Sequence, residues 1–312
     1  MYGYRKTMQK MTLVFLFCMI SVANAGTWIE QRYVDKSAGN YDKELYLKEG
    51  NFPQSEVVEN LNNPTLLYRY DYGEVFETDF DHGKINVNLP YKGSYHLFIQ
   101  ERYVEDSILH IKMYKTRVYN SKGNIEDSLI KEIRGKTVGS HFGKEPFEAV
   151  TFEAVLQKPI KQHHINCCVY SGDIVPIKVY FKQKQLKNTP IVITTQQGWE
   201  KTVNPDSDGL LSFEIPRNTY ADISKNKRFK EQLLIEAFYE ENKSGIYKKK
   251  PYKKIKYYLS IPLSFHTSPL EYTSKSAGFY VVISVIAVFS LGLYYYRRKK
   301  KKIVKEIWFE ED

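Results

Sequence analysis

The sequence predicts a mainly β protein: two antiparallel β-sandwich domains followed by one C-terminal transmembrane helix. Three observations lead to this prediction. Short runs that alternate apolar and polar residues recur between turn residues, a pattern typical of antiparallel sandwiches. Residues 279–296 form an apolar run without a charge, and six consecutive cations follow it from Arg297 to Lys302. An A-x-A motif ends the N-terminal apolar stretch at Ala25.

The C-terminal apolar run is long enough to cross a bilayer, whose hydrocarbon core takes about 20 helical residues and at least roughly 17. The alternative is a buried helix of a soluble core. Such a helix is seldom apolar on every face and then followed by six cations. We therefore predict a transmembrane helix at residues 277–296 and a basic cytoplasmic tail at residues 297–312.

The N-terminus has the three parts of a secretory signal. Arg5, Lys6 and Lys10 precede the short apolar stretch 11–22, and the A-x-A motif ends at Ala25. This order predicts a signal peptide at residues 1–25 that is cut after Ala25. A retained anchor is one alternative, but the apolar stretch is short. A lipoprotein signal is another, but bulky residues precede the first cysteine.

A signal peptide and one span give a type I topology, and the cations after the span agree with the positive-inside rule. Only Cys167 and Cys168 remain in the ectodomain after cleavage. A eukaryotic ectodomain of this size usually has several disulfides, so the scarcity of cysteine indicates a bacterial periplasm. We expect a single-pass protein of the bacterial inner membrane, with a protein partner in the envelope or inner membrane.

The charge excess reflects topology more than ligand binding. The formal net charge is +10 and the pI is about 9.1. Ten of the 46 cations but only four of the 36 acids lie in the leader and the tail. The ectodomain is therefore only mildly basic, and the charge does not argue for nucleic-acid binding.

The ectodomain divides by composition and by turn residues. Residues 26–63 are polar without a sustained period, which predicts an irregular N-terminal arm. We place the first β-sandwich domain at residues 64–158, the second at residues 159–262, and a stalk at residues 263–276. The predicted elements are strands at 66–70, 85–89, 95–104, 108–119, 147–156, 165–170, 175–181, 190–195, 199–203, 211–215, 233–239 and 255–261, and a helix at 224–232.

One stretch resembles a known family. Residues 172–216 contain, in order, Gly172-Asp173, an alternating strand, Gly198-Trp199, Asp206-Ser-Asp-Gly209 and Phe213-Glu-Ile-Pro216. This order resembles the Ig-like sandwich of transthyretin- or carboxypeptidase-regulatory-like domains. It is also similar to bacterial secreted proteins in which such a domain is found alongside nickel and cobalt importers. The resemblance implies that the Asp-x-x-Gly turn joins two strands of a sandwich, and it covers about a seventh of the chain.

The candidate metal ligands are His163, His164, Cys167 and Cys168, because imidazole and thiolate bind Zn, Cu or Ni. On a strand, His164 and Cys168 would lie on one side, roughly 13 Å apart, too far to share an ion. Only an irregular loop could gather them. A vicinal disulfide, a redox role and a structural role are the alternatives. Beyond this possible transition metal, no cofactor is expected.

A calcium site is a second candidate. Asn204, Asp206, Asp208 and Gly209 fit the first half of a calcium loop, but Ile215 stands where a bidentate Glu is needed. We favour a hairpin turn there.

The basic run 248–254 is a third candidate. It could contact anionic headgroups or a cell-wall polymer, and a solvated hairpin loop is the alternative that we favour.

The chain has no G-x-S-x-G, Walker, dinucleotide-binding or zincin motif, and we predict that it is not an enzyme. The favoured function is a membrane-anchored periplasmic binding or structural accessory module that acts through protein–protein or envelope contacts. The alternative is an accessory protein in nickel, cobalt or copper handling. The transmembrane helix contains no ionisable residue in its apolar run, so it offers no transport path of its own.

Overall fold

The computed structural model describes residues 26–33, 43–70, 75–77, 79–87, 89, 93–120, 145–157, 169–217 and 230–301. These residues belong to two units, one built of β-strands that ends at His266 and one that contains helix α3 (Pro269–Lys301). The mainly β sandwich class with a C-terminal apolar helix is confirmed. The predicted signal peptide, residues 1–25, lies outside the described residues.

The largest sheet has eight strands and takes them from both predicted domains. Its order is β14 (Glu200–Val203), β13 (Ile191–Thr195), β16 (Lys230–Glu241), β19 (Lys254–His266), β9 (Ile108–Asn120), β8 (Gly93–Glu105), β4 (Thr65–Tyr70), β5 (Val75–Glu77). All neighbours are antiparallel except β19 and β9, which run parallel. The predicted boundary between residues 158 and 159 therefore does not separate two sandwiches.

Two smaller sheets complete this unit, with a hairpin of β17 (Gly245–Tyr247) and β18 (Lys250–Tyr252). The five-stranded sheet contains β1 (Gly26–Tyr33), β2 (Lys43–Gly50), β3 (Glu56–Val57), β6 (Asp79–Asp81) and β7 (Lys84–Asn86). The four-stranded sheet contains β10 (Phe152–Leu156), β11 (Ile174–Phe181), β12 (Lys184–Gln185) and β15 (Leu210–Glu214). β10 pairs with β11 across the predicted domain boundary.

The prediction of an irregular N-terminal arm is wrong for β1 and β2. These strands form an antiparallel ladder from Gly26 with Gly50 to Tyr33 with Lys43. Charged residues hid the alternation of β2, because the sequence alone does not show that Lys48 is buried. Its ammonium lies 3.5 Å from a carboxylate oxygen of Glu30 on β1, which provides a partner for the buried charge.

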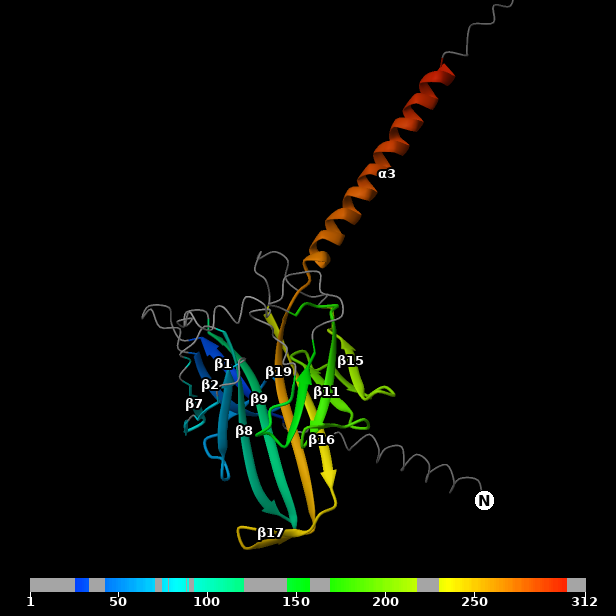
Figure 1. Ribbon diagram of the computed structural model, residues 1–312. Helices are drawn as coiled ribbons and strands as arrows, with labels where there is room; N and C mark the ends of the chain where they lie inside the picture. The colour runs from blue at the N-terminus through cyan, green and yellow to red at the C-terminus, as the bar shows by residue number, and fades with distance from the viewer. Residues whose placement is uncertain are drawn as a thin grey trace, which may run out of the picture. The chain divides into compact units, whose positions relative to one another are not determined.

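The eight-stranded sheet is the middle of three layers (Figure 1). Side chains of successive residues in a strand point to opposite faces. On β8, Phe98 packs into one hydrophobic core, whereas Leu97 and Ile99 pack into another. On β9, Met113 and Tyr114 divide in the same way. Both faces of the central strands are therefore covered.

The first core lies between the central sheet and the four-stranded sheet. The central strands contribute apolar residues such as Ile193, Ile235 and Leu259, and β11 contributes Val175, Ile177 and Val179, all fully or nearly fully buried. Burying one such side chain contributes about 1.5–3 kcal/mol to stability. Through this core, strands β10, β11 and β15 pack against the central sheet that contains β8 and β9.

The second core lies between the opposite face of the central sheet and the five-stranded sheet. It joins Ile29 of β1, Leu45 and Leu47 of β2, and Ile85 of β7 to residues of β8 and β9. A smaller cluster of Trp28, Phe52 and Leu234 extends the same contact to β16.

Side chains of the central sheet also bind the backbone of β1. The Tyr258 hydroxyl accepts a hydrogen bond from Thr27 N at 3.3 Å, and Ser260 Oγ donates to Thr27 O. Gln31 donates its side-chain amide to Thr116 Oγ1 at 3.1 Å. The two bonds at Thr27 provide partners for backbone groups of a buried residue, and the Gln31 bond joins side chains of β1 and β9.

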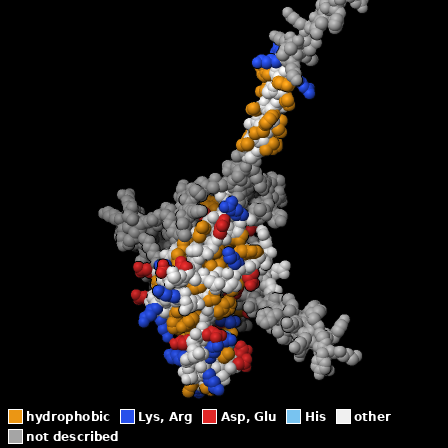
Figure 2. All heavy atoms as spheres, turned by 90° about the vertical axis from the view of Figure 1, so that its right-hand side faces the viewer, with side chains coloured by type: hydrophobic (Ala, Val, Ile, Leu, Met, Phe, Trp, Pro, Cys, Tyr) orange, Lys and Arg blue, Asp and Glu red, His pale blue; other side chains and the backbone are white. Residues whose placement is uncertain are grey.

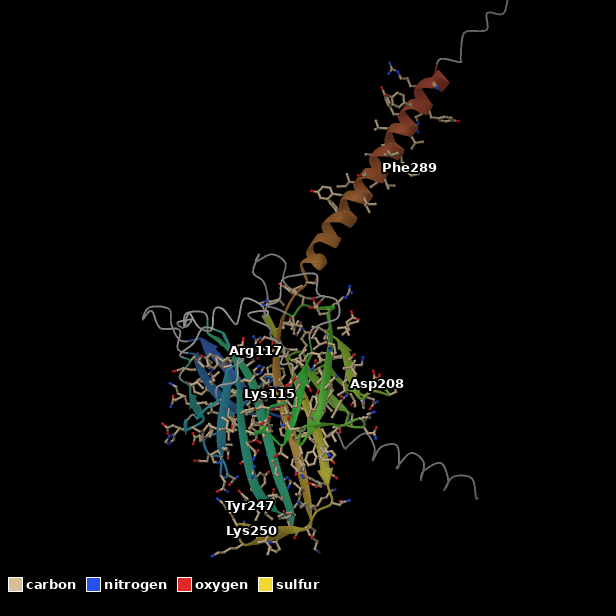
Figure 3. All side chains as sticks on the ribbon, viewed as in Figure 1. Lys115, Arg117, Asp208, Tyr247, Lys250 and Phe289 are labelled. Carbon is tan, nitrogen blue, oxygen red and sulfur yellow. The ribbon has the colours of Figure 1, made fainter. Side chains whose placement is uncertain are left out.

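A buried ion pair connects the central sheet to the four-stranded sheet. The Lys115 ammonium on β9 donates to Glu153 Oε1 at 2.5 Å and to Ala154 O at 3.1 Å. Glu153 Oε2 also accepts from Phe147 N at 2.6 Å. Both charged side chains are almost fully buried. Figure 3 labels Lys115 within the β unit.

Helix α3 has the length and composition of a membrane span. Residues 278–299 form an apolar segment of 22 residues with a mean hydropathy of 1.9, and the large apolar side chains along it are exposed (Figure 2). Ser284 donates its hydroxyl to Tyr280 O at 2.8 Å, so this polar group is satisfied within the helix. The predicted stalk, residues 263–276, is shared between β19 and the start of α3.

Removing one partner of the Lys115–Glu153 pair leaves the other charge buried alone. We expect Lys115→Met or Glu153→Gln to lower the free energy of unfolding by about 3–5 kcal/mol. Thermal or urea unfolding of the detergent-solubilised chain measures the loss. Lys84→Met is the matched control, because its ion pair with Glu44 is more exposed and should contribute about 0–1 kcal/mol. Equal losses for the buried and the exposed pair would contradict this account.

Candidate functional site

The connection between β16 and β19 forms a short hairpin, in which β17 pairs with β18 (Figure 1). A two-residue turn, Lys248 and Lys249, joins the strands. Both residues have positive φ angles, 46° and 66°. Such angles define a type I′ turn, which normally selects Asn-Gly. The sequence therefore accepts an unfavourable backbone conformation to place two lysines at the turn. The hairpin predicted for this basic run is present.

Two tyrosines attach the hairpin to the rest of the unit. Tyr247 and Tyr252 pack against the first hydrophobic core. Gly245 allows the Tyr252 ring to cross β17, because a Cβ on Gly245 would lie 2.5 Å from the Tyr252 hydroxyl oxygen. One face of the hairpin is thus fixed by aromatic packing, and the other face carries the lysines.

Hydrogen bonds hold the base and the turn of the hairpin to two distant segments. Lys253 N donates to Ser107 O at 2.8 Å, in the turn between β8 and β9. The Lys248 ammonium donates to Asn63 Oδ1. The position of the hairpin is therefore set by contacts to residues more than 140 positions earlier in the chain.

The hairpin and its flanks are strongly basic. Residues 243–256 contain no acid and seven lysines. Two of these, Lys254 and Lys256, form ion pairs with Glu240, and the hydrogen bond from Lys254 holds the pKa of the Glu240 carboxyl below its ordinary value. Among the described residues, the other five have no ion-pair partner: Lys243, Lys248, Lys249, Lys250 and Lys253. Of these, Lys248 donates a side-chain hydrogen bond to Asn63.

An apolar side chain lies among these lysines. Ile246 is 75% exposed, more than any other large apolar residue described in the β unit. It lies opposite Pro251 in the hairpin ladder. Figure 3 labels Tyr247 and Lys250 at the hairpin. We call residues 243–253, with Ile246 at their centre, the basic hairpin.

A stacked aromatic pair lies near the hairpin base, on β8 and β9. The rings of Tyr103 and His110 are 5.0 Å apart between centroids and 9° from parallel, and the Lys112 ammonium lies 5.5 Å from the Tyr103 centroid. Burial lowers the pKa of His110. His110 is therefore mostly neutral near pH 7, and the positive charge of this end comes from lysine.

The predicted metal ligands His163, His164, Cys167 and Cys168 lie outside the described residues. The structure does not test whether they come together, and the prediction stays a prediction. Within the described part of the chain, no three His, Cys, Asp or Glu side chains are placed to hold a metal ion.

The calcium-loop candidate is a side-chain-capped turn. Asp206 Oδ1 accepts from Asp208 N at 2.9 Å and from Leu210 N at 2.8 Å, and Gly209 N donates to Asp206 O at 3.0 Å. The Asp206 carboxylate is thus used by backbone donors. The turn connects β14 and β15, which belong to different sheets, so the expected simple hairpin is corrected to a connection between layers.

The sequence shows the basic run but not the residues that hold it in place on the β unit. Ser107 and Asn63, which hold it, carry no local signal, since their contacts depend on the tertiary fold. Nor did the sequence show which lysines are neutralised by Glu240.

Comparisons with known proteins add little. No protein-family model matches the chain, and no curated protein matches it. Among solved structures, a two fibronectin type-III domain segment from chicken tenascin is similar at 9% identity and a TM-score of 0.18, covering 74% of this chain and 97% of that chain. A likeness of this strength carries no argument, and nothing supports the more specific transthyretin-like resemblance. The sandwich and helix α3 by themselves fit a membrane-anchored binding or structural module.

Replacing the two turn residues by the pair that a type I′ turn prefers should stabilise the hairpin. We expect Lys248→Asn with Lys249→Gly to slow hydrogen exchange of the β17 and β18 amides at least tenfold, since left-handed Lys costs roughly 1–2 kcal/mol per residue. Hydrogen-exchange mass spectrometry of the full chain measures this. Lys250→Asn, outside the turn, is the control and should not slow exchange. Unchanged exchange in the double variant would show that the turn is not strained.

Proposed function

We propose that this chain is a membrane-anchored binding module of the bacterial periplasm, and that the basic hairpin binds an acidic surface of a protein partner in the envelope. The observation that supports the proposal most directly is the group of five lysines with no ion-pair partner among the described residues, together with the exposed Ile246 between them in the sequence. The proposal includes the type I topology and the cleaved signal peptide.

The positive charge of the hairpin favours a partner with an acidic surface. Lysines with no acidic neighbour within 4.0 Å gain by approaching an acidic surface, which also steers the encounter. The hairpin is fixed in place by Tyr247, Tyr252 and the bond to Ser107, so little ordering is required on binding.

The exposed isoleucine favours a protein over a polymer or a lipid headgroup. Interfaces between proteins commonly surround an apolar anchor with a polar rim, and Ile246 among lysines has this arrangement. β19 separates the hairpin from the residues that lead to α3. Its 13 residues span about 40 Å at roughly 3.3 Å per residue. The hairpin is thus at the end of the β unit opposite to the end at which the chain continues into α3.

A photo-crosslinking amino acid at position 246 of the full-length chain, in membranes of the cells that produce it, tests the proposal. We expect a defined protein adduct. Reversing the charge of three lysines, Lys249→Glu, Lys250→Glu and Lys253→Glu, should reduce this adduct at least fivefold, because the favourable charge pairing becomes repulsive.

The matched control reverses three exposed lysines elsewhere on the unit, Lys184→Glu, Lys187→Glu and Lys201→Glu, and should leave the adduct unchanged. Loss of the adduct in both triple variants would show that only net charge matters. An adduct with lipid alone, or none at all, would overturn the proposed protein partner.

The metal-handling alternative depends on His163, His164, Cys167 and Cys168. If these residues hold a transition metal, the purified full chain should retain Ni, Co, Cu or Zn at micromolar concentration, and His163→Ala with His164→Ala should release it. Elemental analysis of both proteins decides. Equal or zero metal content in the two proteins would remove this alternative.

A further inference from the structure

The first described residue, Gly26, is buried at the start of β1. It pairs with Gly50 in the ladder between β1 and β2. The next residue is fixed by two hydrogen bonds from β19, from Thr27 N to the Tyr258 hydroxyl and from Ser260 Oγ to Thr27 O. The start of β1 is therefore held in one position against the central sheet.

Gly26 lies against a carboxylate of β16. A Cβ placed on Gly26 would be 2.9 Å from Leu234 Cδ2 and 3.3 Å from Glu236 Oε1. The α-nitrogen is bonded to the same Cα, at about 1.46 Å, so it lies within roughly 6 Å of that oxygen. Opposite charges at such a separation interact strongly when water is excluded.

Glu236 has no cation to balance it among the described residues. Its side chain is 93% buried, with 7% exposed. The Tyr258 hydroxyl donates a hydrogen bond to its Oε1 at 2.6 Å. Burial is the main cause that raises the pKa of the Glu236 carboxyl; the hydrogen bond from Tyr258 lowers it, and the negative charge of Glu200 raises it further. A buried carboxylate without a cation is costly, so a counter-charge is expected.

We propose that Glu236 is a binding site for the chain's own processed N-terminus: cleavage after Ala25 creates an α-ammonium on Gly26 that forms a buried ion pair with this carboxylate. The inference rests on the signal-peptide cleavage that the proposed function includes. A signal peptidase hydrolyses the Ala25–Gly26 bond with one water, leaving a carboxylate on Ala25 and an amine on Gly26, which takes up a proton.

The ion pair would make the packing of β1 depend on processing. Before cleavage the nitrogen of Gly26 is a neutral amide, which can donate one hydrogen bond but carries no charge. After cleavage it is an ammonium with three donors, enough for Glu236 and for a ladder bond as well. Glycine at this position also leaves room for the carboxylate, since a Cβ there would require the ends of the Leu234 and Glu236 side chains to shift.

Intact-mass measurement and N-terminal sequencing of the full-length chain, purified from secreting cells, come first. We expect the mature protein to begin at Gly26. A mature chain that begins elsewhere overturns the inference, while the crosslinking test of the basic hairpin stands independently of it.

The apparent pKa of the α-ammonium is the decisive readout. Acylation of the α-amine at a series of pH values, followed by peptide mapping, reports this pKa, and a paired ammonium should titrate above the usual range of about 7.7–8.0. In Glu236→Gln the same buried amine loses its counter-charge and should titrate at or below that range. Glu231→Gln on the same strand is the matched control and should not change it.

Stability supplies a second measurement. A group whose pKa is raised on folding stabilises the folded state below its unfolded pKa and loses this effect as pH rises through the folded pKa. The Tm difference between the wild type and Glu236→Gln should thus be roughly 5 °C or more at pH 7 and should shrink above pH ~9. The charged or titratable groups that face the pair are Tyr258 and Glu200.

A second variant tests the inference even if the Glu236→Gln protein does not fold. Inserting an alanine between Ala25 and Gly26 moves the ammonium one residue away while leaving Glu236 intact. We expect its α-amine to titrate in the usual range and its Tm to fall. An α-amine that titrates alike in the wild type, in Glu236→Gln and in the insertion variant overturns the inference.

Discussion

The structure depends on the burial of the central sheet on both of its faces. In most antiparallel sheets one face meets a core and the other meets water, so apolar and polar residues alternate. Here alternate residues of β8 and β9 belong to two different cores, one under the four-stranded sheet and one under the five-stranded sheet. Polar groups of the central strands then need partners: Lys115 on β9 pairs with Glu153 on β10, and the Tyr258 hydroxyl on β19 accepts from Thr27 N on β1. The layers are thereby connected by specific polar contacts as well as by apolar packing.

The same constraint explains how far the sequence could predict the fold. Helix α3 was predictable because an uncharged run followed by cations has one simple interpretation in a membrane. The long strands β8 and β9 were predictable from their composition. Their arrangement was not, because residues buried on both sides give no period that distinguishes one sandwich from two. Strand β2 was missed because the burial of Lys48 depends on Glu30, which the local pattern does not show.

The candidate site was predictable in part for a similar reason. A run of lysines at positions 248–254 shows a charged hairpin by itself. Whether each lysine forms an ion pair depends on acidic residues of β16. Lys254 pairs with Glu240, whereas Lys250 has no ion pair among the described residues, and the sequence alone does not show this difference. The four His and Cys residues that were singled out as metal ligands lie outside the described residues, so chemical character alone still defines that hypothesis.

The parallel pair of β19 and β9 has a consequence for the order in which the chain can fold. Its register joins Lys254 to Ile108, residues separated by 146 positions, and β19 is the last strand made before α3. During synthesis from the N-terminus, the β8–β9 pair must therefore wait with one edge unpaired until nearly the whole β unit has been translated. Non-local pairing of this kind slows folding, and an unpaired edge can associate with other chains. The last strand of the sheet ends at His266 and helix α3 begins at Pro269, so only a few residues of translation separate completion of the sheet from synthesis of the apolar helix.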